Sequence, residues 1–135
     1  MTPIQLIDKP LLSGLHDKAQ ESERLRQNFD LRTTPADGSQ RMLNALEVGT
    51  KVPIHRHLKS SETVICIRGA VEEVFFDDAG VETEHFELRY GSDCCAIQVP
   101  RGVYHTCRCL ESGSVIFEAK DRAYDPVGTE DMLEK

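Results

Sequence analysis

Apolar residues near the start of the chain recur with helical spacing. Leu11, Leu12, Leu15, Ala19 and Leu25 follow one another roughly every three or four positions, against a polar opposite face. Asp8 is suited to cap a helix, with Pro10 in its first turn. The pattern predicts one amphipathic helix from about residue 8 to residue 27, packed outside the rest of the structure or against a second subunit.

Beyond a loop expected at residues 28–39, the pattern changes to short β-prone runs separated by turn residues. Asp77-Asp78-Ala79-Gly80 has the composition of a hairpin loop. The runs predict eight strands, at residues 40–47, 51–58, 62–68, 71–76, 81–88, 95–99, 105–110 and 115–120. Short strands with frequent turns are typical of an all-β antiparallel jelly roll or barrel, here preceded by a short N-terminal α-helix.

Three histidines and a glutamate fall where strands would bring them together. His55 and His57 are two positions apart, so on a strand both imidazoles point to one face, with Cα atoms roughly 6.5–7 Å apart. Glu62 opens the next strand after a turn at Lys59-Ser60-Ser61, and His105 follows a Pro-x-Gly turn. We therefore expect His55, His57, Glu62 and His105 to converge on one metal ion.

The donor set limits the choice of metal. Imidazole nitrogens with one carboxylate suit a borderline or hard divalent ion such as Zn, Fe, Mn, Ni or Co, and leave positions open for water or substrate. Glu62 has three possible roles, as a ligand, as a general base or as a partner that orients a histidine. His16 and His85 are expected at the surface, outside this set.

These motifs resemble the cupin superfamily. Gly49, five residues, His55-x-His57, four residues, Glu62, six residues and Gly69 resembles its first motif at every spacing. Pro100-x-Gly102, two residues and His105 resembles its second, although Gly91 stands further upstream and Cys109 replaces the usual asparagine. Residues 40–45 and 117–120 look like those of the WbuC-type cupin metalloproteins, a resemblance that covers about residues 30–126 and implies a cupin jelly-roll barrel (a double-stranded β-helix).

Alternation along the strands adds candidates for chemistry. Asn44 is the better polar contact for the cavity on its strand, although the pattern leaves open which face points inward. Glu118 and Lys120 share a face; if it is inward, Lys120 is a buried cation beside the metal, and if outward the two form a solvated pair. We expect Glu62, Lys120 and Asn44 to be the residues that handle protons or oxyanion charge.

The length, net charge and cysteine content of the chain limit the domain count, the partners and the cellular location that we expect. The 135 residues are one domain's worth, with an N-terminal strand and helix extension at 1–29, the barrel at 30–126 and a tail at 127–135. The net charge of −7 argues against a nucleic-acid partner, and no run approaches the ~20 apolar residues that cross a bilayer. Five cysteines without a CxxC pair, and no export signal at the start, indicate a reduced cytoplasmic protein. Open sheet edges favour a homodimer.

Several functions fit these features. The first is a metal-dependent enzyme on a small polar metabolite, for which the WbuC-type resemblance implies polysaccharide synthesis and an isomerase- or epimerase-like reaction on a sugar or nucleotide sugar. An iron-dependent dioxygenase is a second enzymatic interpretation. The alternatives are a non-catalytic module that binds a metal or small ligand and, less favoured, a metal that only stabilises the fold.

Overall fold

The computed structural model describes residues 3–133. In chain order, the elements are α1 (Lys9–Glu21), β1 (Arg26–Asp30), β2 (Gln40–Leu46), β3 (Ile54–His55), β4 (Glu62–Arg68), β5 (Ala70–Phe76), β6 (Glu82–Arg89), β7 (Ala96–Val99), β8 (Tyr104–Cys109), β9 (Ser114–Lys120), the 3-10 turn η1 (Thr129–Asp131) and β10 (Met132–Leu133). The outermost residues of the expected N-terminal extension and C-terminal tail, 1–2 and 134–135, lie outside the described part.

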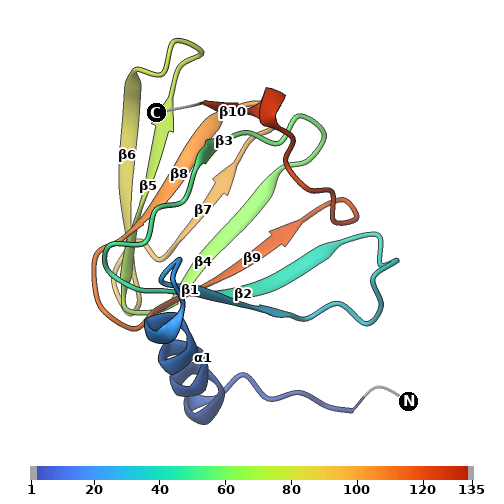
Figure 1. Ribbon diagram of the computed structural model, residues 1–135, viewed down its shortest axis with the longest axis vertical. Helices are drawn as coiled ribbons and strands as arrows, with labels where there is room; N and C mark the ends of the chain where they lie inside the picture. Colours follow the sequence, from blue (N-terminus) through green and yellow to red (C-terminus); the bar gives the residue numbers. More distant parts are fainter. Residues whose placement is uncertain (1–2, 134–135) are drawn as a thin grey trace.

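The strands form two antiparallel sheets that face each other (Figure 1). One sheet has the order β1-β2-β9-β4-β7 and the other β10-β3-β8-β5-β6. From β3 onward, every strand except β6 lies in the opposite sheet from its predecessor, which is the winding of a jelly roll. The predicted fold class is confirmed. Among residues 3–133, no helix combines the length and apolar character needed to span a membrane.

Helix α1 covers the outer face of the sheet that carries β1, β2 and β9 (Figure 1). Asp8 accepts a hydrogen bond from the Leu11 N–H, as expected of the helix cap. Leu15 and Ala19 pack against alternate residues of two strands, namely Leu43, Ala45 and Val115. This contact determines which face of each strand points outward, so the other face of β2 and of β9 lines the interior.

The helix ends earlier than predicted. It stops at Glu21, and residues 26–30 form strand β1, which pairs with β2. Leu25 fits the helical repeat, but its φ of 56° lies in the left-handed region, where the chain turns from helix into strand. The prediction of helix to residue 27 was wrong because the gain from pairing β1 to β2 exceeds local helix propensity.

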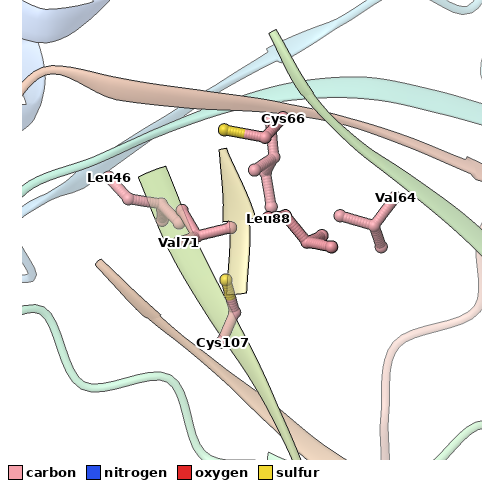
Figure 2. Close-up of a cluster of buried hydrophobic side chains, with 7 residues drawn as sticks. Leu46, Val64, Cys66, Val71, Leu88 and Cys107 are labelled. Atoms are coloured by element: carbon pink, nitrogen blue, oxygen red, sulfur yellow. The ribbon is translucent and has the colours of Figure 1, made fainter. Parts of the chain in front are cut away.

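The core lies between the sheets at the end near α1. Figure 2 shows alternate residues from both sheets meeting there, and the full cluster is Leu46, Val64, Cys66, Val71, Leu88, Cys107 and Ile116. Gly69 joins β4 to β5 with a φ of 75°, and a Cβ there would lie 3.0 Å from the Ser114 Cα. Only glycine fits this close approach without displacing backbone.

Two segments at the other end differ from the predicted pattern. The expected strand at 51–58 is regular only at Ile54–His55, because Pro53 interrupts the ladder before it. The C-terminal segment, predicted from the sequence to be a tail outside the barrel, returns to the sheet, where Met132 pairs with His55. Asp131 accepts a hydrogen bond from the Arg56 guanidinium at 3.0 Å, which ties this segment to the strand that carries the first histidine.

Candidate metal centre

The three motif histidines meet at the end of the interior away from the apolar core. His55 on β3 pairs with His105 on β8, and their ring centroids are 4.5 Å apart. The ring of His57 lies 4.9 Å from His55 and 5.8 Å from His105. One nitrogen from each ring falls in a group whose atoms are all within 4.8 Å of one another. The predicted convergence of these residues is therefore present in the structure.

Backbone carbonyls orient two of the rings. The Nδ1 atom of His55 lies 2.8 Å from the Pro53 carbonyl, and that of His105 lies 3.0 Å from the Val103 carbonyl. A carbonyl only accepts, so each Nδ1 carries the proton and each Nε2 presents a lone pair. The Nε2 atoms of His57 and His105 are buried without a hydrogen-bond partner among the described residues. Buried polar atoms without a partner are rare unless something fills the place of that partner.

Glu62 on β4 brings a carboxylate to the same point. Its Oε1 lies 3.7 Å from His105 Nε2 and its Oε2 lies 3.8 Å from His57 Nε2. These distances are too long for hydrogen bonds, but they leave room for an ion between the groups. Lys120 on β9 occupies the paired position and places its Nζ 3.3 Å from Glu62 Oε2. Lys120 therefore points inward and is nearly buried, which is one of the two orientations that the alternation along β9 left open.

The protonation states of His55, His57 and Glu62 suit metal binding. Burial, reinforced by His105, lowers the pKa of His55 to about 4, and burial with Lys120 lowers the pKa of His57 to about 4. Both rings are therefore neutral at pH 7. Although burial would raise the pKa of Glu62, the nearby His105 and Lys120 outweigh it and keep the carboxyl ionised. For His105, Glu62 more than offsets the burial and raises the pKa.

A second buried carboxyl, Glu73, was missed by the sequence reasoning. It lies on β5, is 2% exposed and belongs with Glu62 and His105 to another group of donor atoms within 4.8 Å. Burial raises its pKa to about 7. The signal was available: Glu72 and Glu73 are adjacent on an otherwise apolar strand, so one of them has to face inward.

Asn44 and Glu118 form the polar wall beside this group. The Asn44 amide donates a 2.9 Å hydrogen bond to Glu118 Oε2 across the paired strands β2 and β9. Burial and the neighbouring Glu62 carboxylate raise the pKa of Glu118. Asn44 therefore lies on the inward face of β2. The sequence pattern had left open which face of this strand points inward. Asn44 contacts Glu118, and no described contact joins it to the histidines.

Three spaces that share lining residues surround the donors. The inner cavity, of about 120 Å³, is lined by His55, His105, Glu62, Glu73, Glu118 and Asn44, among others. The metal-side cleft, of about 280 Å³, shares His55, Glu62 and Arg26 with the inner cavity and adds His57, Lys120, Arg24 and part of the C-terminal segment. The outer cleft, of about 560 Å³, runs past His57 and Lys120 beneath residues 122–131. The donors are therefore reachable from outside.

The remaining histidines lie elsewhere. His85 on β6 is exposed, as predicted, and lies 3.0 Å from Glu82. His16 on α1 was expected at the surface, but its side chain is only 20% exposed and its Nε2 lies 2.9 Å from Glu47. It holds the helix against the loop after β2.

The donor set fits a divalent metal. Three imidazole nitrogens with a carboxylate is the mixed N/O set of Zn, Fe, Mn, Ni and Co sites. The two buried Nε2 atoms without partners are the atoms a cation would bind. His55, His57, His105 and Glu62 could hold the ion, and Glu73 could add a fifth ligand or orient His105.

A family model described as Domain of unknown function (DUF6016) matches residues 7–88. That range includes α1, the first motif and Glu73 and ends before His105. No curated protein matches the sequence.

Solved structures share the fold. KdgF from Halomonas sp. superposes with a TM-score of 0.57 at 20% identity, over 74% of this chain and 82% of its own. Oxalate oxidase in complex with glycolate gives 0.63 at 14% identity, over 79% of this chain and 56% of its own. The capsular polysaccharide assembling protein CapF from Staphylococcus aureus gives 0.59 at 20% identity, over 78% of this chain and 28% of its own. These are cupin-fold proteins, and the chain has the cupin fold.

Proposed function

The chain belongs to the family described as Domain of unknown function (DUF6016), and we propose that it is a metal-dependent enzyme acting on a small polar metabolite. One observation carries the proposal. The Nε2 atoms of His57 and His105 are buried without partners, facing the Glu62 carboxylate and the ring of His55. A divalent ion would satisfy all of these groups at once, and no other group in the described residues does.

Access to the donors favours catalysis over a sealed structural ion. His55, His57 and Glu62 line the metal-side cleft, so a ligand entering it reaches the donors directly. Lys120 lies 3.3 Å from Glu62 in the same cleft, which places a titratable group within hydrogen-bond reach of the site. A non-catalytic ion in a barrel with its own apolar core would need neither the opening nor the buried lysine.

The proposed reaction uses three residues of this chain, Glu62, Lys120 and Asn44, in different roles. When bound, the metal acts as a Lewis acid that polarises a carbonyl or hydroxyl oxygen of the substrate. Glu62, kept ionised by His105 and Lys120, serves as ligand or as proton acceptor. Lys120 stabilises negative charge that develops on the substrate, because its ammonium faces the cleft. Asn44 holds Glu118 at 2.9 Å and so keeps that carboxyl in place beside the reacting groups.

A sugar or nucleotide sugar is the proposed substrate, and an isomerase- or epimerase-like reaction in polysaccharide synthesis is the proposed setting. Two observations support it. The residues that resemble the WbuC-type proteins, 40–45 and 117–120, lie on the paired strands β2 and β9, and four of them, Met42, Asn44, Glu118 and Lys120, line the metal-side cleft. The similar structure CapF is a capsular polysaccharide assembling protein. We propose the WbuC-type assignment on the same grounds.

We also propose a homodimer. Each sheet ends in two strands without a further partner among the described residues, β1 and β7 in one sheet and β10 and β6 in the other. The segment before α1 exposes Ile4, Leu6 and Ile7, of which Ile4 is 94% exposed. Sedimentation equilibrium at micromolar concentration tests the proposal, and a monomeric mass there contradicts it.

The enzyme proposal is tested by metal analysis followed by turnover. The full chain is purified without added metal, its metal content is measured, and it is incubated with a panel of nucleotide sugars and simple aldoses. We expect about one divalent ion per chain and isomerised product that disappears with a chelator and returns with the same metal. Metal at this stoichiometry with no turnover across the panel would favour the non-catalytic module, and absence of metal would refute the site.

A further inference from the structure

Two arginines from outside the motifs face the metal-side cleft. Arg24 and Arg26 flank the turn between α1 and β1, and both line the cleft together with His55, His57 and Glu62. Arg26 extends further, into the lining of the inner cavity. Positive charge thus reaches the donors from a part of the chain that precedes both histidine motifs.

Neither arginine has a carboxylate partner among the described residues. The arginine ion pairs there involve Arg32, Arg41, Arg56, Arg89, Arg101 and Arg108. Of the guanidinium N–H groups of Arg26, one donates to the Lys51 carbonyl at 2.8 Å, which leaves others free. Burial and the like charge of Arg24 lower the pKa of Arg26. Two guanidinium groups that repel each other at the edge of a cleft are stabilised by an anion between them.

None of the acids that line the same cleft pairs with either arginine among residues 3–133. Glu62 is held by Lys120, and Glu118 accepts from Asn44. Asp125, on the C-terminal segment, lines the cleft but makes no ion pair with either arginine in the described part of the chain. The arginines are therefore available to a ligand.

The backbone between the two arginines is unusual. Leu25 has a φ of 56°, the one positive value outside glycine in residues 3–133. Two backbone hydrogen bonds hold it: its N–H donates to the Ser22 carbonyl at 3.0 Å, and its carbonyl accepts from the Glu47 N–H at 2.9 Å. The Thr50 hydroxyl fixes the Arg24 carbonyl at 2.6 Å. Strain maintained by its surroundings tends to occur at functional sites.

We propose that Arg24 and Arg26 form the subsite for an anionic group of the substrate, a carboxylate or a phosphate, while its hydroxyl or carbonyl oxygens reach the histidine cluster. The second half of this statement rests on the proposed function; the anion subsite itself does not need the metal. The cleft volume of about 280 Å³ fits a molecule of monosaccharide size. The substrate class is therefore a sugar acid or a sugar phosphate.

Calorimetric titration of the full chain tests this subsite. The probes are glucuronate, glucose 6-phosphate and inorganic phosphate, with glucose as the uncharged control, each against the chelator-treated and the metal-loaded protein. We expect at least one of the two charged sugars to bind ten times more tightly than glucose or better, in both forms. The stronger of the two identifies the group as carboxylate or phosphate. Equal binding of glucose, or no binding of any anion, overturns the proposal.

Variants test whether anion binding depends on Arg24 and Arg26 or on surface charge in general. Arg24→Gln and Arg26→Gln should each weaken anion binding about tenfold or more, the usual effect of losing a charge-assisted hydrogen bond, while metal content stays unchanged. Arg26→Lys should recover part of the loss. The matched control is Arg108→Gln on the outer face of β8, which should bind like the wild type. Thermal unfolding shows that each variant is folded. If the Arg24 and Arg26 variants bind like Arg108→Gln, the subsite is refuted; anion binding retained in a protein that takes up no metal would refute only the enzyme proposal.

Discussion

Lys120 and Glu62 occupy paired positions on β9 and β4, and their charged atoms lie 3.3 Å apart inside the barrel. The Glu62 side chain is 6% exposed and that of Lys120 is 14% exposed. A buried carboxylate is costly unless it is compensated, so the lysine and the proposed metal share the task of holding Glu62 ionised.

The effect of Lys120→Met on the free energy of unfolding should therefore depend on whether the metal is bound. In the chelator-treated protein, we expect the free energy of unfolding to fall by about 2 kcal/mol, because Glu62 loses its neighbouring cation. In the metal-loaded protein the loss should be smaller, since the metal compensates for the same carboxylate. Denaturant unfolding with and without metal measures both. Lys59→Met, an exposed lysine near the outer cleft, is the control and should change little; an equal loss in both states of the Lys120 variant would contradict the shared role.

Glu73 allows a test of the inner donors. Glu73→Gln keeps the shape of the side chain but removes its charge, and we expect the affinity for Zn²⁺ or Co²⁺ to fall about tenfold, whether Glu73 ligates the ion or orients His105. Competition titration with a chromophoric chelator measures this affinity. Glu72→Gln is a matched control, because that carboxylate lies on the opposite face of β5 and pairs with Arg108. Unchanged affinity in Glu73→Gln would exclude it from the site.

Glu47 links α1 to the barrel in a pH-dependent way. Burial would raise its pKa, but the Val48 N–H, the Ser112 hydroxyl and His16 together lower it. A carboxyl with a lowered pKa stabilises the fold above its ordinary pKa, near 4.5, and this contribution is lost as the pH falls through the lower, folded-state value. Glu47→Gln should thus cost roughly 1 kcal/mol at pH 7, where the ion-assisted hydrogen bonds are lost.

The same cost should be smaller at pH 3 than at pH 7, because lowering the pH toward the lowered pKa of Glu47 protonates the wild-type carboxyl as well. Urea unfolding at both pH values measures the difference between the two proteins. Glu23→Gln, an exposed residue in the turn after α1, should show no such difference. A Glu47→Gln penalty that stays constant with pH would mean that its carboxylate charge has no stabilising role.

Replacing Gly69 and Gly91 by alanine distinguishes two costs, that of a strained backbone conformation and that of steric overlap. Both have positive φ, 75° and 76°, but a Cβ at Gly69 would meet the Ser114 backbone, whereas at Gly91 nothing lies within 4 Å. Gly91→Ala should cost about 1 kcal/mol for the backbone conformation alone. Gly69→Ala should cost at least 2–3 kcal/mol, because the close approach adds steric overlap. Equal losses in thermal unfolding would show that the contact with Ser114 carries no cost.

The sequence predicts the fold and the central donors because both depend on local periodicity. Alternation places His55 and His57 on one face, and the turn at residues 59–61 brings Glu62 back beside them. The face of β9 that carries Lys120 could be stated only as an alternative. It was decided by α1, which covers the opposite face of that sheet.

Other features depended on contacts between distant segments. Leu25 fits the helical repeat, and nothing local indicates that pairing with β2 would end the helix at Glu21. Met132 pairs with His55, and because the two residues are far apart in the sequence, no local pattern indicates this pairing. Arg24 and Arg26 fall inside the range predicted to be helical and instead line the cleft, because the chain turns at Leu25.

The convergence of His55, His57, Glu62 and His105 on one cation is tested most directly by measuring bound metal, by elemental analysis, in the wild type and in His57→Ala purified side by side. Denaturant unfolding of both proteins accompanies the analysis. We predict about one divalent ion per wild-type chain, essentially none in His57→Ala, and cooperative unfolding in both. A wild type that carries no metal, or a His57→Ala variant that binds it at the same stoichiometry and affinity, would contradict the account.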